Sequence, residues 1–442
     1  MLHRFRKSSI LLASIKKRTN MKTLLFVLMM LFFSAGAMAQ EQSRYVPYVP
    51  DPVIKEMIEK NKTQKKTEKE ETSKIRAQQK EAAKTKRDNR QKLVTTVDGI
   101  VKPGTPESFN APYHFAPVAQ YLTGTCWDFA TTSYFESEIF RLSGKKIKLS
   151  EIHTTYYEYL DKAQRFIRER GKSEFGQGSE SNAVIRIWKK QGVVPAEVYL
   201  GVADKDGRHN HSFMFGEMTN YLNYLKANDF WDEDIALRSI RLILDKYLTR
   251  PPEKFTFEGV EYTPKSFFKS LPLNLDDYLA LMSTTSVPFY TRGVFDVPDN
   301  WWRSDEYYNL PLDEFYDVIK TAVEMKQTLP IGGDVSEPGY YGEQDICFVP
   351  SFDIPVASIN QDAREFRFYN HTTQDDHTIH LLGHKVVDGT DWFLIKDSAR
   401  SARKGEYQGY LFFRGDYVKL KMLTAMVHKS AMAKYLNKFK ER

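Results

Sequence analysis

One stretch of this chain, residues 127 to 143, constrains the fold more than any other. It has the spacing of an α-helix, and its apolar side chains lie on more than one face. One half of the helical wheel carries six of them and the opposite half two: Trp127, Ala130, Tyr134, Phe135, Ile139 and Leu142, against Phe129 and Phe140. Such a helix must be buried on more than one side. We expect it to end near Gly144, with other elements packed around it.

The rest of the chain can supply those elements. Its 442 residues, 41% apolar and 14% aromatic, are enough for a sizeable core and exceed a single small domain. Strand-like runs occur late, around Leu381, at Phe393 to Ile395 and at Gly409 to Phe413. Helices followed by strands predict an α+β fold. The further helix-like stretches are residues 149 to 169, 181 to 191, 214 to 227, 233 to 248 and 311 to 327.

Residues 1 to 39 have the pattern of a secretory signal peptide. A charged region begins at Met21, residues 24 to 33 are apolar, and Ala37-Met38-Ala39 fits a cleavage site. Residues 1 to 20 are then an upstream extension. The apolar run is too short to span a bilayer, so we expect an exported protein, periplasmic or extracellular, without a stable membrane span after cleavage. An uncleaved N-terminal anchor is the alternative.

The net positive charge of the chain comes from its N-terminal part. The net charge is +7, but residues 1 to 39 contribute +7 and residues 51 to 93 contribute +6, which leaves −6 for residues 94 to 442. The basic character is therefore no sign of a nucleic-acid partner, and we expect none. Residues 40 to 104 form a charged arm that we expect to be a solvated helix or disordered. A propeptide or a partner-binding arm is the second interpretation.

Two cysteines are present, Cys126 and Cys347, and an exported chain with two cysteines allows a disulfide. The surroundings of Cys126 favour another role. Gly124-Thr125-Cys126-Trp127 opens the buried helix, so the thiol lies at the positive end of the helix dipole, where the thiolate is favoured. With a general base from elsewhere, Cys126 would be a nucleophile that attacks carbonyl groups. Cys347 has apolar neighbours, and we expect a buried free thiol.

The segment from Gln120 to Ala130, QYLTGTCWDFA, resembles the active-site segment of the papain-like cysteine peptidases. In that family a Gln lies six residues before the nucleophile and a Trp directly follows it. The likeness is sharper with one branch, the bleomycin hydrolases and bacterial aminopeptidases C, and extends over roughly residues 105 to 415. The segments that carry it follow in order: Leu149 to Glu151, Tyr156 to Ile167, Gly192 to Pro195, Pro251 to Phe255, Asn274 to Tyr278 and Gly332 to Val335.

The resemblance also identifies a histidine. Asp376-His377-Thr378-Ile379-His380 and the residues up to Gly383 are similar to the segment that holds the family's catalytic histidine, which places His377 in that role. His380 and His384 are competitors. In a strand, residues three or seven positions apart point to opposite faces, so we expect both of these to be structural or exposed. Their spacing is a weak metal signal without a matching acid.

The third catalytic residue is expected at Asp397, since Trp392 to Ser398 resembles the family segment that provides it. The family usually has Asn there, and a Trp where this chain has Ala399. An Asp can still orient the imidazole, and its charge should raise the histidine pKa and favour a thiolate–imidazolium pair. We expect the missing Trp to leave this hydrogen bond more open to water. Gln120 and the backbone N–H of Cys126 would form the oxyanion hole.

The resemblance thus implies a papain-like fold: a helical subdomain with a central catalytic helix and a β-barrel-like subdomain. Residues 105 to 442 would form this domain, with a helical insertion at about residues 200 to 330. The implied function is an exported cysteine peptidase acting on peptides or proteins, without cofactor or metal, and with aminopeptidase action.

In the branch, subunits form a hexamer, and a C-terminal arm in the cleft restricts cleavage to the N-terminus of the substrate. The basic segment after Val418 does not match that arm. Endopeptidase action therefore stays open. So do two other functions, a catalytically degenerate peptide-binding protein and an interaction protein of the cell envelope.

Overall fold

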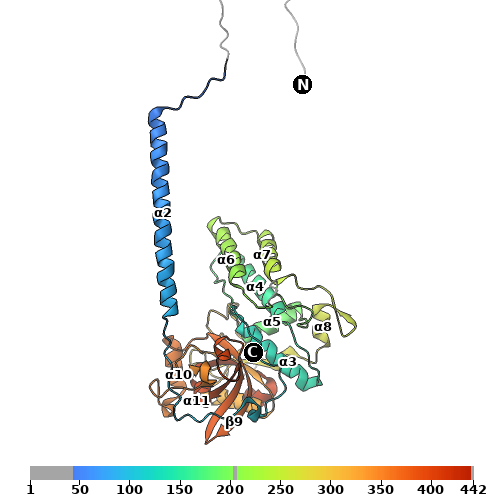
Figure 1. Ribbon diagram of the computed structural model, residues 1–442. Helices are drawn as coiled ribbons and strands as arrows, with labels where there is room; N and C mark the ends of the chain where they lie inside the picture. The colour runs from blue at the N-terminus through green and yellow to red at the C-terminus, as the bar shows by residue number, and fades with distance from the viewer. Residues whose placement is uncertain (1–42, 203–206, 440–442) are drawn as a thin grey trace, which may run out of the picture. The chain divides into compact units, whose positions relative to one another are not determined.

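A computed structural model describes residues 43 to 202 and 207 to 439. The predicted signal peptide lies outside these residues. The described residues divide into two units, one before residue 92 and one from residue 92 onward. In the first, the charged segment forms helix α2 (Pro52–Asp88), drawn in blue in Figure 1. Asp51 caps it by accepting hydrogen bonds from the backbone N–H groups of Val53 and Ile54, and none of its residues is buried.

The second unit begins with the helices. Helix α3 (Cys126–Ser143) ends at Gly144, which has a left-handed φ of 71°. Ser150 caps the next helix by accepting from the N–H of His153. Residues 200 to 330, predicted as a helical insertion, contain helices and also short strands. The helices after α3 are α4 (Glu151–Arg168), α5 (Ser181–Gln191), α6 (Ser212–Ala227), α7 (Glu233–Leu248), α8 (Pro264–Ser270) and α9 (Leu312–Glu324), with α10 (Gln361–Tyr369), α11 (Gly415–Lys421) and α12 (Ala433–Leu436) between and after later strands.

The strands form a ten-stranded mixed sheet and one small hairpin. The order in the sheet is β4-β5-β3-β12-β6-β9-β10-β11-β8-β7, with parallel pairs only at β3/β5 and β8/β11 among the described residues. The fold class is therefore α+β, as predicted. The strands are β1 (Phe255–Phe257) and β2 (Val260–Tyr262) in the hairpin, and β3 (Tyr278–Met282), β4 (Arg292–Gly293), β5 (Tyr307–Asn309), β6 (Leu329–Gly333), β7 (Tyr340–Tyr341), β8 (Ile346–Cys347), β9 (His377–Val387), β10 (Thr390–Lys396), β11 (Tyr410–Arg414) and β12 (Met422–His428) in the sheet.

Helix α3 lies between the helices and the sheet. Thirteen of its eighteen residues are buried, and it packs against α4 and α5 on one side and against β6 and β9 on the other. The prediction of a helix buried on more than one side is confirmed. Because α3 begins at Cys126, this packing fixes the position of the thiol relative to the sheet.

No helix among the described residues combines the length and the apolar character that a membrane crossing requires.

Candidate active site

Cys126 is the first residue of α3, and its side chain is partly exposed. The N–H groups in the first turn of a helix have no partner within the helix, so the backbone N–H of Cys126 needs a partner from outside it. The chain before Cys126 is held by Gln177, whose side-chain oxygen accepts from the N–H of Gly124 (2.9 Å). The backbone oxygen of Gln177 accepts from the Trp127 indole (3.2 Å).

His377 begins strand β9 and pairs with Gly333 of β6. Its Nε2 lies 2.7 Å from Oδ1 of Asp397. Burial alone would lower the pKa of His377, but the charges of Asp397 and Cys126 and the hydrogen bonds to both outweigh it, so the pKa lies well above its usual value. Cys126, His377 and Asp397, predicted from distant segments, are thus brought together.

Asp397 directly follows β10, which is antiparallel to β9. The end of β10 and the start of β9 therefore lie at the same end of the hairpin, which places Asp397 beside His377. Its Oδ1 also accepts from the N–H of Ala399 (2.8 Å). Burial opposes the charged carboxylate, but the charge of His377 and these hydrogen bonds lower the pKa of Asp397 below its ordinary value.

The expectation that the missing Trp leaves this pair open to water is wrong. Asp397 is 1% exposed, and its second oxygen, Oδ2, accepts from the hydroxyl of Tyr340 (3.0 Å). Tyr340, in β7, is itself buried and lies within 3.2 Å of the Ser401 hydroxyl. A tyrosine from another strand thus covers the acid. No spacing in the sequence connects it to Asp397, and sequence reasoning missed it.

Gln120 is anchored next to Asp397. Its Oε1 accepts from the hydroxyl of Ser398 (2.6 Å), and its backbone N–H donates to the Ser398 carbonyl (3.0 Å). The amide nitrogen Nε2 donates to the Thr123 carbonyl (2.8 Å), which uses one of its two N–H groups. The hydrogen bond to Thr123 thus leaves the second N–H of the amide available. Gln120 is 7% exposed, so its amide is held rigidly at the site.

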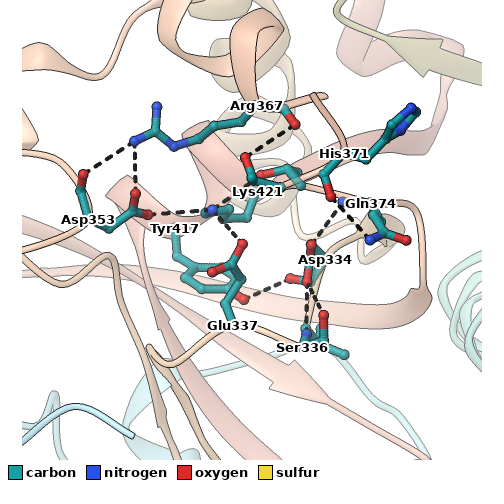
Figure 2. Close-up of polar contacts among 12 residues, drawn as sticks. Asp334, Ser336, Glu337, Asp353, Arg367, His371, Gln374, Tyr417 and Lys421 are labelled. Carbon is teal, nitrogen blue, oxygen red and sulfur yellow. Dashed lines mark hydrogen bonds and ion pairs between the residues drawn. The ribbon is translucent and has the colours of Figure 1, made fainter. Parts of the chain in front are cut away.

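The loop that leads into His377 is held by a separate polar network, shown in Figure 2. Asp334, just after β6, accepts from the backbone N–H groups of Ser336 and Gln374 (both 2.8 Å). The buried ammonium of Lys421 donates to Glu337 (2.6 Å) and to Thr373 (3.2 Å). This network is built on the sheet and restrains residues 373 and 374, a few positions before the imidazole.

The competing histidines have other partners. His380 is fully buried, with Nδ1 2.9 Å from the hydroxyl of Ser133 in α3, and burial lowers its pKa well below the usual value. His384 Nε2 lies 2.7 Å from Asp391. Among the described residues, neither histidine contacts Cys126. This agrees with the alternation of side-chain direction along a strand. No group of three or more His, Cys, Asp or Glu in the described part of the chain has the arrangement of a metal site.

Both cysteines are free, so the disulfide alternative is not formed. Cys347 lies in β8 and is fully buried, and burial raises the pKa of its thiol well above the usual value. The expectation of a buried free thiol is confirmed for Cys347, whereas Cys126 is partly exposed.

No protein-family model matches this chain, and no curated protein matches it significantly. Among solved structures, it is similar to the crystal structure of PepW from Lactobacillus rhamnosis HN001 (DR20). The TM-score is 0.63 with 19% sequence identity, and the match covers 80% of this chain and 89% of that chain. This likeness shows a shared fold across most of both chains.

Proposed function

We propose that this protein is a cysteine peptidase with a papain-like fold of the bleomycin hydrolase and aminopeptidase C branch. The observation that carries the proposal is the His377 imidazole, bonded to a buried carboxylate and raised in pKa by both Asp397 and Cys126. An imidazole with this pKa takes the proton of the thiol and holds it, which creates the thiolate nucleophile. The fold shared with PepW and the ordered sequence segments support the same proposal.

The proposed reaction is acyl transfer in two steps. The Cys126 sulfur attacks the carbonyl carbon of a peptide bond, and the negative charge that develops on the carbonyl oxygen is stabilised by the free N–H of Gln120 and the backbone N–H of Cys126. His377 then donates its proton to the leaving nitrogen, and the C–N bond breaks to give a thioester. In the second step His377 takes a proton from water, whose oxygen attacks the thioester and releases the acid and the thiol.

Asp397 fixes which ring nitrogen acts. Because Nε2 is bonded to the Asp397 carboxylate, Nδ1 is left to face the thiol. The carboxylate also stabilises the charged imidazolium through both steps, and Tyr340 and the Ala399 N–H hold it in place.

Aminopeptidase action is part of the proposal, and endopeptidase action is the alternative. Export to the periplasm or the extracellular space, a peptide or protein substrate and a hexameric assembly are proposed from the signal pattern and the branch resemblance. The chemistry needs no cofactor, because the nucleophile, base and oxyanion donors all come from the chain.

Labelling with an epoxide inhibitor of cysteine peptidases tests the chemistry. We expect covalent modification at Cys126, located by peptide mass mapping, and its loss in Cys126→Ala and in His377→Ala. A Cys347→Ala variant is the control and should be labelled like the wild type. A folded wild-type protein that is not labelled would contradict the proposal in favour of a catalytically degenerate binding protein.

A further inference from the structure

Gln177 lies in the loop between α4 and α5 and contacts the chain on both sides of the nucleophile. Its Oε1 accepts from the N–H of Gly124 (2.9 Å), two residues before Cys126. Its backbone oxygen accepts from the indole of Trp127 (3.2 Å), the residue after Cys126. A Cβ on Gly124 would lie 2.9 Å from the Cβ of Gln177, so these two residues are packed directly against each other. Gln177 therefore borders the thiol.

These contacts fix the orientation of the Gln177 amide. A backbone N–H donates and cannot accept, so the amide atom that faces Gly124 must be the oxygen. The hydroxyl of Tyr159, a buried residue of α4, lies 3.4 Å from the same oxygen and 3.0 Å from Nδ1 of His211. The oxygen of the amide is thus turned to the interior, and the nitrogen Nε2, on the other branch, points away from Gly124 and Tyr159.

The amide nitrogen of Gln177 is an unused donor. Nε2 donates no hydrogen bond to any of the described residues, and it is not one of their buried polar atoms without a partner. The side chain of Gln177 is partly exposed. Nε2 is therefore open to solvent and presents two N–H groups beside the thiol.

The proposed reaction indicates which part of the substrate lies there. At the carbon that Cys126 attacks, the oxygen faces its N–H donors, and the leaving nitrogen faces His377 on the sheet side of α3. The remaining substituent is the Cα of the residue whose peptide bond is cleaved. Helix α3 has β6 and β9 on one side and α4 and α5 on the other. This Cα and its side chain are therefore directed toward the helices, where Gln177 lies.

Carboxyl groups beside this amide discriminate among possible acceptors. The Asp299 carboxylate fills the space that a Cβ on Gly178, the next residue, would need. Glu180 follows in the chain and is hydrogen-bonded to Asp375. The charge of Lys162 lowers the pKa of Asp299 and of Glu180 and so offsets part of this negative charge. A carboxylate on the substrate would add another negative charge here, whereas an uncharged oxygen would add none.

We propose that Gln177 is a specificity determinant that donates from Nε2 to an uncharged oxygen in the side chain of the residue whose peptide bond is cleaved. The favoured substrates are then peptides with glutamine or asparagine at that position, ahead of glutamate and aspartate. This assignment rests on the proposed peptidase function and gives it a side-chain preference.

The test compares fluorogenic amides of methionine and of methionine sulfoxide. Their side chains have the same length, and the sulfoxide adds an uncharged oxygen that accepts and cannot donate. Each is supplied with a free and with an N-acetylated α-amine, so that both modes of cleavage are covered. The measured quantity is the ratio of kcat/KM for the sulfoxide over methionine, in which effects common to both substrates cancel.

Two substitutions of Gln177 should lower this ratio to different extents. Gln177→Met removes the donors, and we expect the ratio to fall about fivefold. Gln177→Glu keeps an acceptor for Gly124 but replaces the donors by a negative charge, and the ratio should fall about tenfold or more. The same variant should raise kcat/KM for a lysine over a norleucine substrate about fivefold, because its carboxylate accepts from an ammonium group.

Gln191→Glu is the matched control. It adds the same charge at the C-terminal end of α5, and both ratios should stay within about twofold of the wild type. Epoxide labelling of Cys126 in each variant verifies that the site is folded.

The possible results separate the two proposals. Sulfoxide-to-methionine ratios that are unchanged in both Gln177 variants, or that fall equally in Gln191→Glu, overturn the assignment while the peptidase proposal stands. So does a wild type that prefers a glutamate over a glutamine substrate. A wild type that is labelled but cleaves none of these amides also overturns it, because an uncharged oxygen beside the cleaved bond is then not accepted. A wild type that neither cleaves nor is labelled refutes the peptidase proposal, and the assignment falls with it.

Discussion

The His377–Asp397 pair and the Glu180–Asp375 pair lie near the same thiol, and burial favours the neutral form of all three acids. Their outcomes are opposite. Asp397 faces a cation and N–H and O–H donors, and its pKa falls. Asp375 faces other acids, and its pKa rises. The partner, and not the depth of burial, therefore decides whether a buried acid here is a permanent charge or shares a proton with a neighbouring carboxyl.

The largest expected effect comes from removing the base of the first pair. His377→Ala should lower kcat on a free-amine aminoacyl substrate by about 10⁴-fold or more. The variant has no base to form the thiolate and no acid to protonate the leaving amine. His384→Ala is the matched control, since it removes another histidine of β9 that is bonded to Asp391. Steady-state kinetics on both variants checks this. Equal losses would show that the strand, and not the imidazole of His377, is what matters.

The Glu180–Asp375 pair is expected to lower the free energy of unfolding at neutral pH. Burial and the charge of Asp299 raise the pKa of Glu180 from 4.5 to about 6. The folded protein thus keeps a proton that the unfolded chain has released, so the stabilisation is present below pH 4.5 and is lost as pH rises through about 6. Glu180→Gln should therefore raise the free energy of unfolding at pH 7 by about 2 kcal/mol.

Denaturant unfolding at pH 4 and pH 7 measures this effect. The gain should be present at pH 7 and nearly absent at pH 4, and Glu174→Gln should show neither. A variant that is less stable at pH 7 would mean that Glu180 is compensated in the free protein, and the contrast between the two pairs would fail.

A smaller effect is expected when the charge of the first pair is removed but its acceptor is kept. Asp397→Asn introduces the residue that the resembling family usually has. Without the carboxylate charge the pKa of His377 should fall, so the imidazolium loses its proton at lower pH. The alkaline limb of the kcat/KM profile should move to lower pH by about one unit or more. A shift to higher pH would contradict the assigned partner.

The smallest effect is expected from a change at Tyr340, the residue that shields Asp397 from solvent. Tyr340→Phe removes one hydrogen bond to the carboxylate and leaves the ring in place. We expect a loss of about 1 kcal/mol in the free energy of unfolding and a loss of activity of a few-fold. Thermal unfolding and turnover on the same preparation check both. An unchanged protein would show that the Ala399 N–H and His377 alone hold Asp397.

The sequence was informative where a function depends on residues close together in the chain. The helix that begins at Cys126, the histidine segment and the acid after β10 were all predicted, and the antiparallel pairing of β9 and β10 explains why the last two meet. Tyr340, Gln177 and the Glu180–Asp375 pair were not predicted. They come from separate loops and short strands, and their proximity depends on tertiary packing that leaves no periodic trace in the sequence.

Helix α2 has one consequence for handling the protein. Since none of its 37 residues is buried, its peptide bonds are held only by local helical hydrogen bonds and open readily to a protease. Once the predicted signal peptide is removed, residues 40 to 442 have a net charge of 0, and further loss of residues 40 to 93 leaves −6. Cleavage just after this helix would thus make the protein bind more strongly to an anion exchanger at neutral pH, which makes chromatography a direct readout of processing.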